Sequence, residues 1–213
     1  NADLGIALDG DADRLQMVDA TGRLFNGDEL LYVLAKDRLD RGERLGGAVG
    51  TLMTNLAVEN AIKGLGIGFE RANVGDRYVL ETLLEKGWSI GGENSGHILT
   101  LDAHSTGDAI IASLQVLKSL RLLNQSLHDA TKDAPLFPQI LINIEMHKKI
   151  DLENNKSIQD VIKNVEEKLN NKGRVLLRPS GTEPKIRVMV EGENLEEVKT
   201  YANQIAEKVK EAA

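Results

Sequence analysis

The sequence predicts an α/β protein in which layered domains of mixed α/β sheet are followed by a small α+β domain. Over the first half of the chain, short apolar runs alternate with segments of helical periodicity, an order typical of layered α/β domains. Beyond a proline-containing stretch at residues 131–139, half-exposed strands and amphipathic helices replace that pattern. Apolar residues make up 41% of the chain and aromatic residues 3%, so we expect a globular protein with an aliphatic core.

The first expected elements are two short strands on either side of an acidic turn. The apolar runs LGIAL (residues 4–8) and LQMV (residues 15–18) have the length and composition of strands. A helix is expected to begin at Asn26, which acidic residues follow, and to end near Gly42. The apolar positions of this helix are Leu30, Leu31 and Leu34.

A second series of elements begins at the run GGAVGTLMTN. Residues 48–53 predict a buried strand, and Thr54 or Asn55 is expected to cap the helix that follows it. Two glycines, Gly64 and Gly66, are expected to end that helix. The next expected elements are a helix after Asp76, a strand in the run WSIGG (residues 88–92) and a long helix from about Gly107.

The stretch TKDAPLFPQ (residues 131–139) is the expected linker, because proline disfavours both helix interiors and central strands. After it, the run QILINIEM (residues 139–146) alternates like a half-exposed strand. Ser157 and Asp160 resemble a capping box at the start of a helix. The remaining expected elements are strands at residues 174–178 and 186–192 around a tight loop, and an amphipathic helix from Asn194.

Composition excludes several classes of protein. The net charge of −7 argues against nucleic acid or an anionic membrane as a partner, since both are bound by clustered Lys and Arg. There is no cysteine, which excludes disulfides, thiolate metal sites and cysteine nucleophiles. No apolar run approaches the roughly 18 residues of a membrane span, and no signal peptide is recognised, so we expect a cytoplasmic protein. The chain begins with Asn1 rather than Met, and we expect a fragment whose N-terminal part is absent.

The acidic turn DGDAD carries Asp9, Asp11 and Asp13 at alternate positions after an apolar run. An EF-hand calcium loop is excluded, because its sixth and twelfth positions would be Arg14 and Ala20 in place of Gly and a carboxylate. Three carboxylates suit Mg²⁺, which prefers oxygen ligands, and Arg14 is placed to contact a phosphate near the metal. A haloacid-dehalogenase-type phosphatase, with Asp9 as nucleophile, and a merely solvated polar turn remain alternatives.

The run GGENSGH (residues 91–97) places a carboxylate, an amide, a hydroxyl and an imidazole between glycines. Glycines let the backbone approach a ligand closely, and Glu93 with Ser95 can bind paired hydroxyls of a sugar. His97 can carry a proton near neutral pH. The alternative is a turn whose polar side chains face water.

The run RPSGTEPKIR (residues 178–187) has the chemistry of an anion site. Hydroxyl groups, the N–H groups of a glycine turn and two guanidinium groups can converge there on a phosphate. These groups belong to Arg178, Ser180, Gly181, Thr182 and Arg187. An ordinary hairpin would explain SGT but not an arginine on each side of it. Ser180 is not expected to be a nucleophile, because no base lies beside it in the sequence.

A fourth run, NVGDRYV, places Asp76 and Arg77 at the start of a helix. Asp76 can serve there as the N-cap. Arg77 has two interpretations, surface exposure and contact with a ligand, and the sequence does not decide between them.

Taken together and in this order, four runs resemble functional loops of the α-D-phosphohexomutase superfamily. DGDADR is similar to its metal loop, VGDRYV to the basic loop of domain three, GENSGH to the sugar-binding loop and RPSGTEPKIRVMVEG to the phosphate-binding loop. The runs GTLMTN, GENSGH and VGDRYVLETLLEKGW are most similar to the bacterial phosphoglucosamine mutases. The resemblance covers essentially the whole chain, and implies the end of domain two at residues 1–42, domain three at 43–134 and domain four at 135–213.

The resemblance also implies a role for each matching residue. The Mg²⁺ ligands, one ion per chain, would be Asp9, Asp11 and Asp13. Arg14, close to the reacting phosphoryl group, and His97, near the proton transfers, would be catalytic. The residues that bind a hexosamine phosphate would be Arg77, Glu93, Asn94, Ser95, Arg178, Ser180, Gly181, Thr182 and Arg187. Glucosamine or glucose 1,6-bisphosphate would be the activator, and a homodimer stays open as the assembly.

The implied reaction interconverts glucosamine 6-phosphate and glucosamine 1-phosphate through a phosphoserine enzyme and a bisphosphate, a step of amino sugar metabolism toward UDP-N-acetylglucosamine. The catalytic serine of the superfamily lies in a loop resembling TASHNP, and no such run occurs here. We therefore expect no mutase turnover from this chain alone. The alternatives are a phosphomannomutase or phosphoglucomutase of the same superfamily, a Mg²⁺-dependent sugar-phosphate phosphatase, and a non-catalytic module that binds sugar phosphates.

Overall fold

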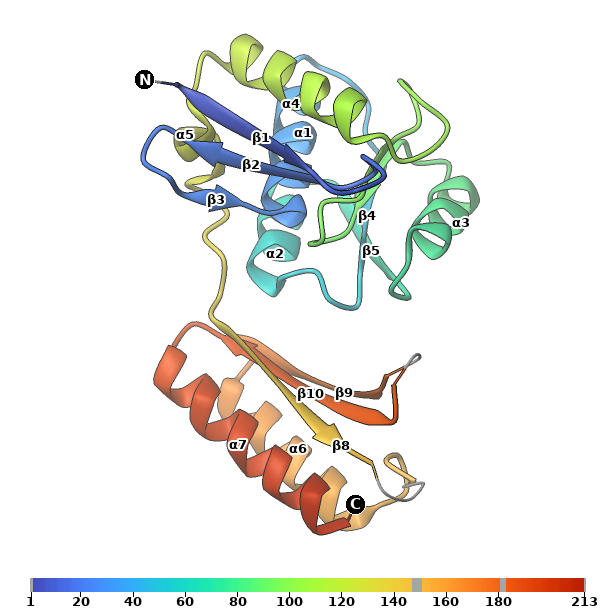
Figure 1. Ribbon diagram of the computed structural model, residues 1–213, viewed down its shortest axis with the longest axis vertical. Helices are drawn as coiled ribbons and strands as arrows, with labels where there is room; N and C mark the ends of the chain where they lie inside the picture. Colours follow the sequence, from blue (N-terminus) through green and yellow to red (C-terminus); the bar gives the residue numbers. More distant parts are fainter. Residues whose placement is uncertain (1, 147–150, 181–182, 213) are drawn as a thin grey trace. The chain divides into compact units, whose positions relative to one another are not determined.

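The computed structural model describes residues 2–146, 151–180 and 183–212. Contacts divide the chain into two compact units, Asn1–Leu136 and Phe137–Ala213, and the division falls inside the proline-containing stretch. Figure 1 traces the chain through its helices and strands. The first unit combines two sheets with helices and the second packs helices on an antiparallel sheet, so the predicted α/β class with an α+β C-terminal part is confirmed.

A small antiparallel sheet opens the first unit. Its strands β1 (Leu4–Leu8), β2 (Leu15–Asp19) and β3 (Leu24–Phe25) lie side by side in that order. The predicted strands on either side of the acidic turn are thereby confirmed. Leu8 lies opposite Leu15, so residues 9–14 form the hairpin loop that joins β1 to β2.

Helix α1 (Gly27–Asp40) follows this sheet and begins where the sequence predicts it. The Asn26 side chain accepts hydrogen bonds from the N–H groups of Asp28 and Glu29, and the Glu29 carboxylate accepts one from the Asn26 N–H. This capping box satisfies N–H groups that the first turn of a helix leaves without partners. Past the other end, Gly42 has a φ of +77°, a conformation that glycine adopts without strain.

The second sheet of the first unit has the order β5-β4-β6-β7. Strand β4 pairs parallel with β5 and with β6, and β7 pairs antiparallel with β6. The chain leaves β4 toward β5 on one side and later returns to β6 on the other, so β4 marks a switch point, where α/β sheets commonly bind ligands. The elements are β4 (Gly47–Thr51), α2 (Leu56–Gly64), β5 (Gly68–Ala72), α3 (Asp76–Lys86), β6 (Ile90–Gly92) and β7 (Ile98–Thr100).

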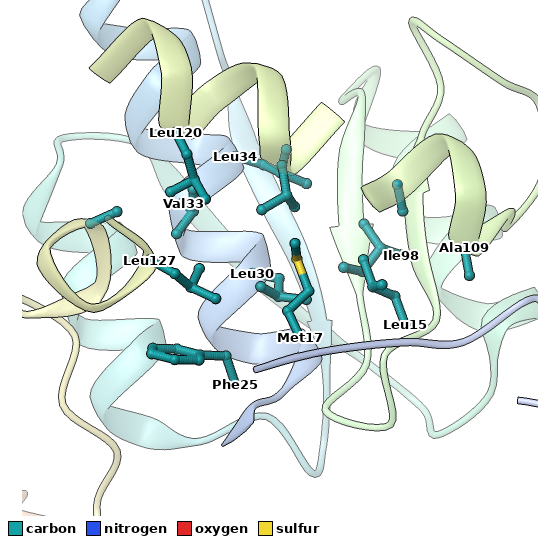
Figure 2. Close-up of a cluster of buried hydrophobic side chains, with 13 residues drawn as sticks. Leu15, Met17, Phe25, Leu30, Val33, Leu34, Ile98, Ala109, Leu120 and Leu127 are labelled. Carbon is teal, nitrogen blue, oxygen red and sulfur yellow. The ribbon is translucent and has the colours of Figure 1, made fainter. Parts of the chain in front are cut away.

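Helices α4 (Ala109–Leu123) and α5 (Leu127–Thr131) complete the first unit. A buried cluster joins α1 and α4 to the small sheet and to β7, and Figure 2 shows its side chains converging between these elements. The cluster includes Leu15, Met17, Phe25, Leu30, Leu34, Ile98, Val116, Leu120 and Leu127. Because β2 and β7 contribute to one core, the loop before β2 and the loop before β7 are brought to the same region.

The second unit is an antiparallel sheet in the order β8-β10-β9, with two helices on one face (Figure 1). Apolar side chains of the sheet and of both helices form one aliphatic core, as the low aromatic content predicts. Helix α6 has a strongly one-sided apolar face, and α7 is amphipathic as predicted. The elements are β8 (Gln139–Glu145), α6 (Lys156–Leu169), β9 (Gly173–Pro179), β10 (Lys185–Gly192) and α7 (Leu195–Ala212).

At three predicted helix starts, the structure agrees with one expected cap and differs from two. Asn55, one of the two expected caps, is the N-cap of α2 and accepts from the Ala57 N–H. The expected capping box at Ser157 is wrong, because α6 begins earlier: Asn155 is its N-cap and accepts from the Ile158 N–H. The expected cap at Asp76 is also wrong. Gly75 occupies the cap position of α3 without any side-chain hydrogen bond, and Asp76 is already the first helical residue.

Four elements, β3, β5, β7 and α5, have no counterpart in the sequence prediction. Strand β5 has the sequence GFERA, in which the charged Glu70 and Arg71 interrupt the apolar run by which a buried strand is predicted. Arg71 pairs with Glu59 of α2, and Glu70 pairs with Lys86 of α3, so neighbouring helices neutralise both charges. Along the described parts of the chain, no helix combines the length and the apolar character that crossing a membrane requires.

Candidate functional site

The hairpin loop between β1 and β2 brings the three predicted metal ligands together. One carboxylate oxygen from each of Asp9, Asp11 and Asp13 lies within 4.8 Å of the other two. Around an octahedral Mg²⁺ with bonds near 2.1 Å, neighbouring oxygens are about 3 Å apart and opposite ones about 4.2 Å. The limit of 4.8 Å on the observed separations is close to the larger of these two values. The donor set is all oxygen, as Mg²⁺ prefers, so the residues fit this ion.

Backbone hydrogen bonds hold the loop in this conformation. Asp9 Oδ1 accepts from the N–H groups of Asp13 and Arg14 at 3.2 and 3.1 Å. Burial raises the pKa of the Asp9 carboxyl, but the hydrogen bond from the Arg14 N–H and others within the loop outweigh it, so the pKa lies below its ordinary value. Ala12 has a φ of +59°, and its carbonyl accepts from the N–H of Ala109, the first residue of α4, at 3.0 Å. The loop is thus fixed at both its acidic end and its turn.

Arg14 is the cation nearest to the three carboxylates. Its Nε atom lies 3.8 Å from Asp9 Oδ2 and 3.8 Å from Asp13 Oδ1. The side chain is 56% exposed, so the guanidinium group is free to turn toward a ligand that approaches the loop. The contact of Arg14 with a phosphate near the metal stays a prediction.

The run GGENSGH forms the hairpin between β6 and β7. The Glu93 N–H donates to the His97 carbonyl at 3.0 Å, and the Gly96 N–H donates to the Glu93 carbonyl at 2.9 Å. Gly96 has a φ of +100°, and a Cβ there would lie 2.1 Å from the Leu15 carbonyl oxygen. Glycine is therefore required at Gly96 both by the backbone conformation and by the close approach of β2.

The acidic loop and the β6–β7 loop are joined directly. The Leu15 N–H donates to the Gly96 carbonyl at 3.0 Å, and Gln16 Nε2 donates to the Ser95 carbonyl at 3.1 Å. The Gly27 N–H at the start of α1 donates to the Asn94 carbonyl at 3.3 Å. Two of the predicted functional runs, far apart in the sequence, thus form one rigid structure in the first unit.

Glu93 also connects this structure to the loop before α3. Its Oε1 atom accepts from the Gly75 N–H at 2.9 Å. Gly75 has a φ of +130°, which only glycine adopts readily. The Glu93 carboxylate keeps a second oxygen that can accept a hydrogen bond from a ligand hydroxyl, and Gly75 belongs to the same run as Arg77.

Arg77 lies in the first turn of α3 and is exposed. Its side chain is 79% exposed, and its Nε donates to Glu81 one helical turn later at 2.8 Å. The hydrogen bond with Glu81 raises the pKa of Arg77 above its ordinary value. Arg77 is thus exposed, and its predicted contact with a ligand stays a prediction.

In the second unit, two of the predicted phosphate-binding residues lie side by side. Arg178 of β9 is directly opposite Arg187 of β10. The Nε atom of each is buried and has no hydrogen-bond acceptor among the described residues. Burial, and after it the charge of Arg187, lowers the pKa of Arg178. Two adjacent guanidinium groups whose Nε atoms lack acceptors among the described residues favour the binding of an anion.

The turn between β9 and β10 contains the other predicted members of this anion site. The Ser180 N–H donates to the Lys185 carbonyl at 2.7 Å, which closes the hairpin. Arg187 lies 3.6 Å from Glu183, a weak ion pair that an anion can displace. Gly181 and Thr182 lie outside the described residues.

Sequence reasoning missed residues that act through their backbone or through a lack of side chain. Gly75 donates to Glu93, Ala12 accepts from α4, and Gly27 allows α1 to reach the β6–β7 loop, where a Cβ would lie 2.0 Å from the Glu93 carbonyl oxygen. Gly27 directly follows the helix cap, and Gly75 precedes a predicted helix start. A glycine beside a predicted helix start is the sequence signal that could have identified Gly27 and Gly75.

Two family models match the chain. The model described as phosphoglucomutase/phosphomannomutase, alpha/beta/alpha domain III, matches residues 26–136. The model described as phosphoglucomutase/phosphomannomutase, C-terminal domain, matches residues 141–208. Together the two matches extend over both compact units.

Curated proteins named phosphoglucosamine mutase are similar to the chain over nearly all its residues. The one from Polynucleobacter asymbioticus is 62% identical over 208 residues, which are 98% of this chain and 46% of that protein. The one from Paraburkholderia phytofirmans is 57% identical over 212 residues, 100% of this chain and 47% of that protein. The chain therefore spans about half the length of the curated relatives it matches.

Solved structures show the same fold. The crystal structure of Aspergillus fumigatus N-acetylphosphoglucosamine mutase in complex with GlcNAc-6P and magnesium matches with a TM-score of 0.82 at 24% identity, over 96% of this chain and 52% of that one. A phosphoglucomutase/phosphomannomutase family protein from Burkholderia thailandensis matches with a TM-score of 0.77 at 20% identity, over 99% of this chain and 47% of that one. At these identities the likeness establishes the fold.

Proposed function

Because the chain belongs to the phosphoglucomutase/phosphomannomutase family, we propose that it forms part of a phosphosugar mutase that interconverts glucosamine 6-phosphate and glucosamine 1-phosphate. Family membership confirms the resemblance carried by the four sequence runs. The substrate assignment is supported by relatives named phosphoglucosamine mutase at 55–62% identity. The Aspergillus fumigatus enzyme, whose crystal structure is a complex with GlcNAc-6P and magnesium, shares the fold.

The observation that carries the proposal is the direct junction of the acidic loop with the β6–β7 loop. Leu15 and Gln16, which follow the carboxylates, are hydrogen-bonded to Gly96 and Ser95. A hexose bound by Glu93 and Ser95 is thereby held beside the groups that neutralise phosphoryl charge. Positioning and charge neutralisation are the main contributions of a protein to phosphoryl transfer.

Each part of the site has a proposed role. Asp9, Asp11 and Asp13 hold Mg²⁺, which supplies charge neutralisation for the phosphoryl group when it is bound. Arg14 contacts that phosphoryl group. Glu93 binds sugar hydroxyls through the carboxylate oxygen that does not accept the hydrogen bond from the Gly75 N–H.

Arg178 and Arg187 bind the phosphate that does not react. The second unit thereby contributes binding energy remote from the reacting centre. The proposed donor of the phosphoryl group is a phosphoserine. Turnover proceeds through a hexose bisphosphate, which would also serve as activator.

No run resembling TASHNP occurs among the 213 residues, and no base lies beside Ser180 in the sequence. We therefore expect this chain alone to bind Mg²⁺ and the sugar phosphate but not to turn it over. The substrate-binding roles of Asn94 and of the other residues named in the sequence analysis are proposed because the runs that contain them resemble functional loops of the family.

A chimera tests the function. The part of the Polynucleobacter relative that lies N-terminal to the matched region is fused to this chain, and conversion of glucosamine 6-phosphate to glucosamine 1-phosphate is followed by ³¹P NMR with Mg²⁺ and glucose 1,6-bisphosphate. We expect conversion by the chimera, none by the chain alone, and a loss of at least about 100-fold for the Asp11→Asn chimera, the size of a lost charge-stabilising contact.

Three outcomes would contradict this assignment. Faster conversion of mannose or glucose phosphates would move the substrate to another branch of the family. Release of inorganic phosphate without the bisphosphate, abolished by Asp9→Asn, would indicate a phosphatase. Saturable binding without conversion by the chimera would indicate a binding module.

A further inference from the structure

Arg71 of β5 binds the loop that follows the neighbouring strand β4. Its side chain is partly buried, with 18% of it exposed. The Nη1 atom donates to the carbonyls of Thr51 and Thr54 at 2.9 and 2.8 Å. The Nε atom donates to Glu59 Oε2 of helix α2 at 2.6 Å. One guanidinium group thus holds together the end of β5, the loop after β4 and the helix that begins after that loop.

The loops that follow β4, β5 and β6 begin at the same edge of the second sheet, because these three strands are parallel. The loop after β6 carries Glu93, and the loop after β5 leads to Gly75. The loop after β4 lies between them, since β4 is the middle strand of the three. Arg71 therefore binds the middle loop of the edge at which α/β sheets commonly bind ligands.

A short path along the backbone leads from Arg71 to the Glu93 carboxylate. The carbonyl of Ala72, the next residue, accepts from the Leu52 N–H in the loop after β4 at 3.0 Å. Three residues later, the Gly75 N–H donates to Glu93 Oε1 at 2.9 Å. Only two residues separate Ala72 from Gly75, so a shift in the end of β5 moves the Gly75 N–H as well.

We propose that Arg71 is a positioning residue of the proposed sugar site, which fixes the end of β5 to the loop after β4 and thereby keeps the Gly75 N–H on one oxygen of Glu93. The inference rests on the proposed function, because that function assigns the binding of sugar hydroxyls to Glu93. Arg71 acts through the backbone and does not touch the sugar. A carboxylate that is already oriented loses less conformational freedom when a ligand binds, so a fixed Glu93 binds a hydroxyl group more tightly.

The chemistry of this contact suits arginine and supplies a matched control. A planar guanidinium group can donate to carbonyls and to a carboxylate at the same time, whereas a lysine ammonium is a single point of charge. Lys63 pairs with the same Glu59 at 2.6 Å, from a position where 51% of its side chain is exposed. Within the described parts of the chain, Lys63 makes no hydrogen bond to the loop after β4. Lys63→Met therefore removes a cation from Glu59 and leaves that loop intact.

The hydrogen bond of the Gly75 N–H gives a readout that needs no substrate. Hydrogen exchange of single amides is measured by NMR on the 213-residue chain. A hydrogen bond to a carboxylate slows exchange, and we expect Arg71→Met and Glu93→Ala each to speed exchange at Gly75 by about 10-fold or more. Lys63→Met should leave it unchanged. An unchanged rate at Gly75 in the Arg71→Met chain would overturn the proposal.

A second amide of the first unit separates positioning from general damage. The Arg14 N–H donates to Asp9 Oδ1 at 3.1 Å, a bond of the same kind in the acidic loop, which Arg71 does not hold. We expect exchange at Arg14 to stay at the wild-type rate in the Arg71→Met chain. Equal acceleration at Arg14 and Gly75 would indicate a purely structural role and overturn the proposal. If Arg71→Met does not fold, Arg71→Lys, which keeps a cation beside Glu59, is judged by the same comparison.

Kinetics of the chimera connect this contact to the sugar. We expect Arg71→Met to raise KM for glucosamine 6-phosphate by about 5- to 30-fold and to leave kcat within about 3-fold, because the interaction that is weakened binds the substrate before and during the reaction. Lys63→Met should change neither constant. An unchanged KM would overturn the role of Arg71 in sugar binding. A wild-type chimera that does not convert the substrate would contradict the proposed function alone, since hydrogen exchange at Gly75 still decides whether Arg71 positions Glu93.

Discussion

Four glycine-to-alanine substitutions around the acidic loop separate two costs that the structure predicts for an added methyl group. At Gly10 the Cβ would meet nothing within 4 Å, and at Gly22 it would meet nothing but φ is +88°. At Gly27 a Cβ would lie 2.0 Å from the Glu93 carbonyl oxygen. At Gly96 both costs apply, because φ is +100° and the Leu15 carbonyl oxygen would lie 2.1 Å away. The set is therefore a two-by-two design of backbone strain and steric overlap.

The expected losses in free energy of unfolding follow from these observations. Gly10→Ala should change stability by less than about 0.5 kcal/mol, as surface substitutions do. Gly22→Ala should cost about 1–2 kcal/mol for a left-handed backbone with a Cβ. Gly27→Ala should cost about 1–3 kcal/mol for overpacking against backbone that cannot easily move. Gly96→Ala should cost about 2–5 kcal/mol, the sum of the two effects.

Trp88 is the single tryptophan of the chain and lies in the first unit, so its fluorescence reports the unfolding of that unit in guanidinium chloride. The midpoint should fall in the order Gly10, Gly22 and Gly27, then Gly96, with an unchanged slope. A Gly96→Ala chain no less stable than Gly22→Ala would refute the inferred contact between the β6–β7 loop and β2. A stable Gly27→Ala chain would refute the contact between α1 and that loop.

Two further predictions concern ion pairs. Burial raises the pKa of Glu59, but the interactions with Lys63 and Arg71 outweigh it and hold the pKa below its ordinary value of 4.5. The stability that this carboxylate contributes is therefore present above pH 4.5 and is lost as pH falls through the lower pKa of the folded state. When stability is measured by Trp88 fluorescence as a function of pH, Glu59→Gln should therefore reduce the loss of stability at acidic pH. In the second unit, Arg174→Met should cost about 3–5 kcal/mol, because it leaves the fully buried Glu191 without its cation. The double variant Arg174→Met, Glu191→Leu should recover most of that loss in thermal unfolding followed by circular dichroism, and an undiminished loss would contradict this explanation.

Most elements of the fold could be predicted because their signals are local. The strands β1 and β2, the start of α1 and the proline-containing stretch all depend on residues close together in the sequence. Strand β5 escaped prediction because its charged residues are neutralised by ion pairs with α2 and α3, which local pattern does not contain. The start of α6 was misplaced because Asn155, Ser157 and Asp160 all have capping side chains, and only the backbone conformation selects Asn155.

The loops of the candidate site could be predicted from the sequence, but the contacts between these loops could not. Sequence runs indicated which side chains carry the chemistry, and three carboxylates at alternate positions already predicted a cation site. Gln16 and Ser95, however, lie 79 positions apart, and their contact depends on how β2 and β7 share one core. The same holds for His97, whose contact with Asp13 follows from the register of Arg14 beside it. The ion pair of Arg77 with Glu81, one helical turn later, is by contrast a local contact that the sequence spacing itself contains.

The acidic loop explains how a folded chain can keep three like charges close together before a cation arrives. Repulsion among Asp9, Asp11 and Asp13 would spread an unsupported turn. Here the turn is fastened to α4 through Ala12 and to the β6–β7 loop through the residue after Arg14, and neither bond involves a carboxylate. Contacts of the loop with the rest of the first unit therefore offset the repulsion. Such preorganisation favours tight and selective binding, because little conformational entropy is lost when the ion binds.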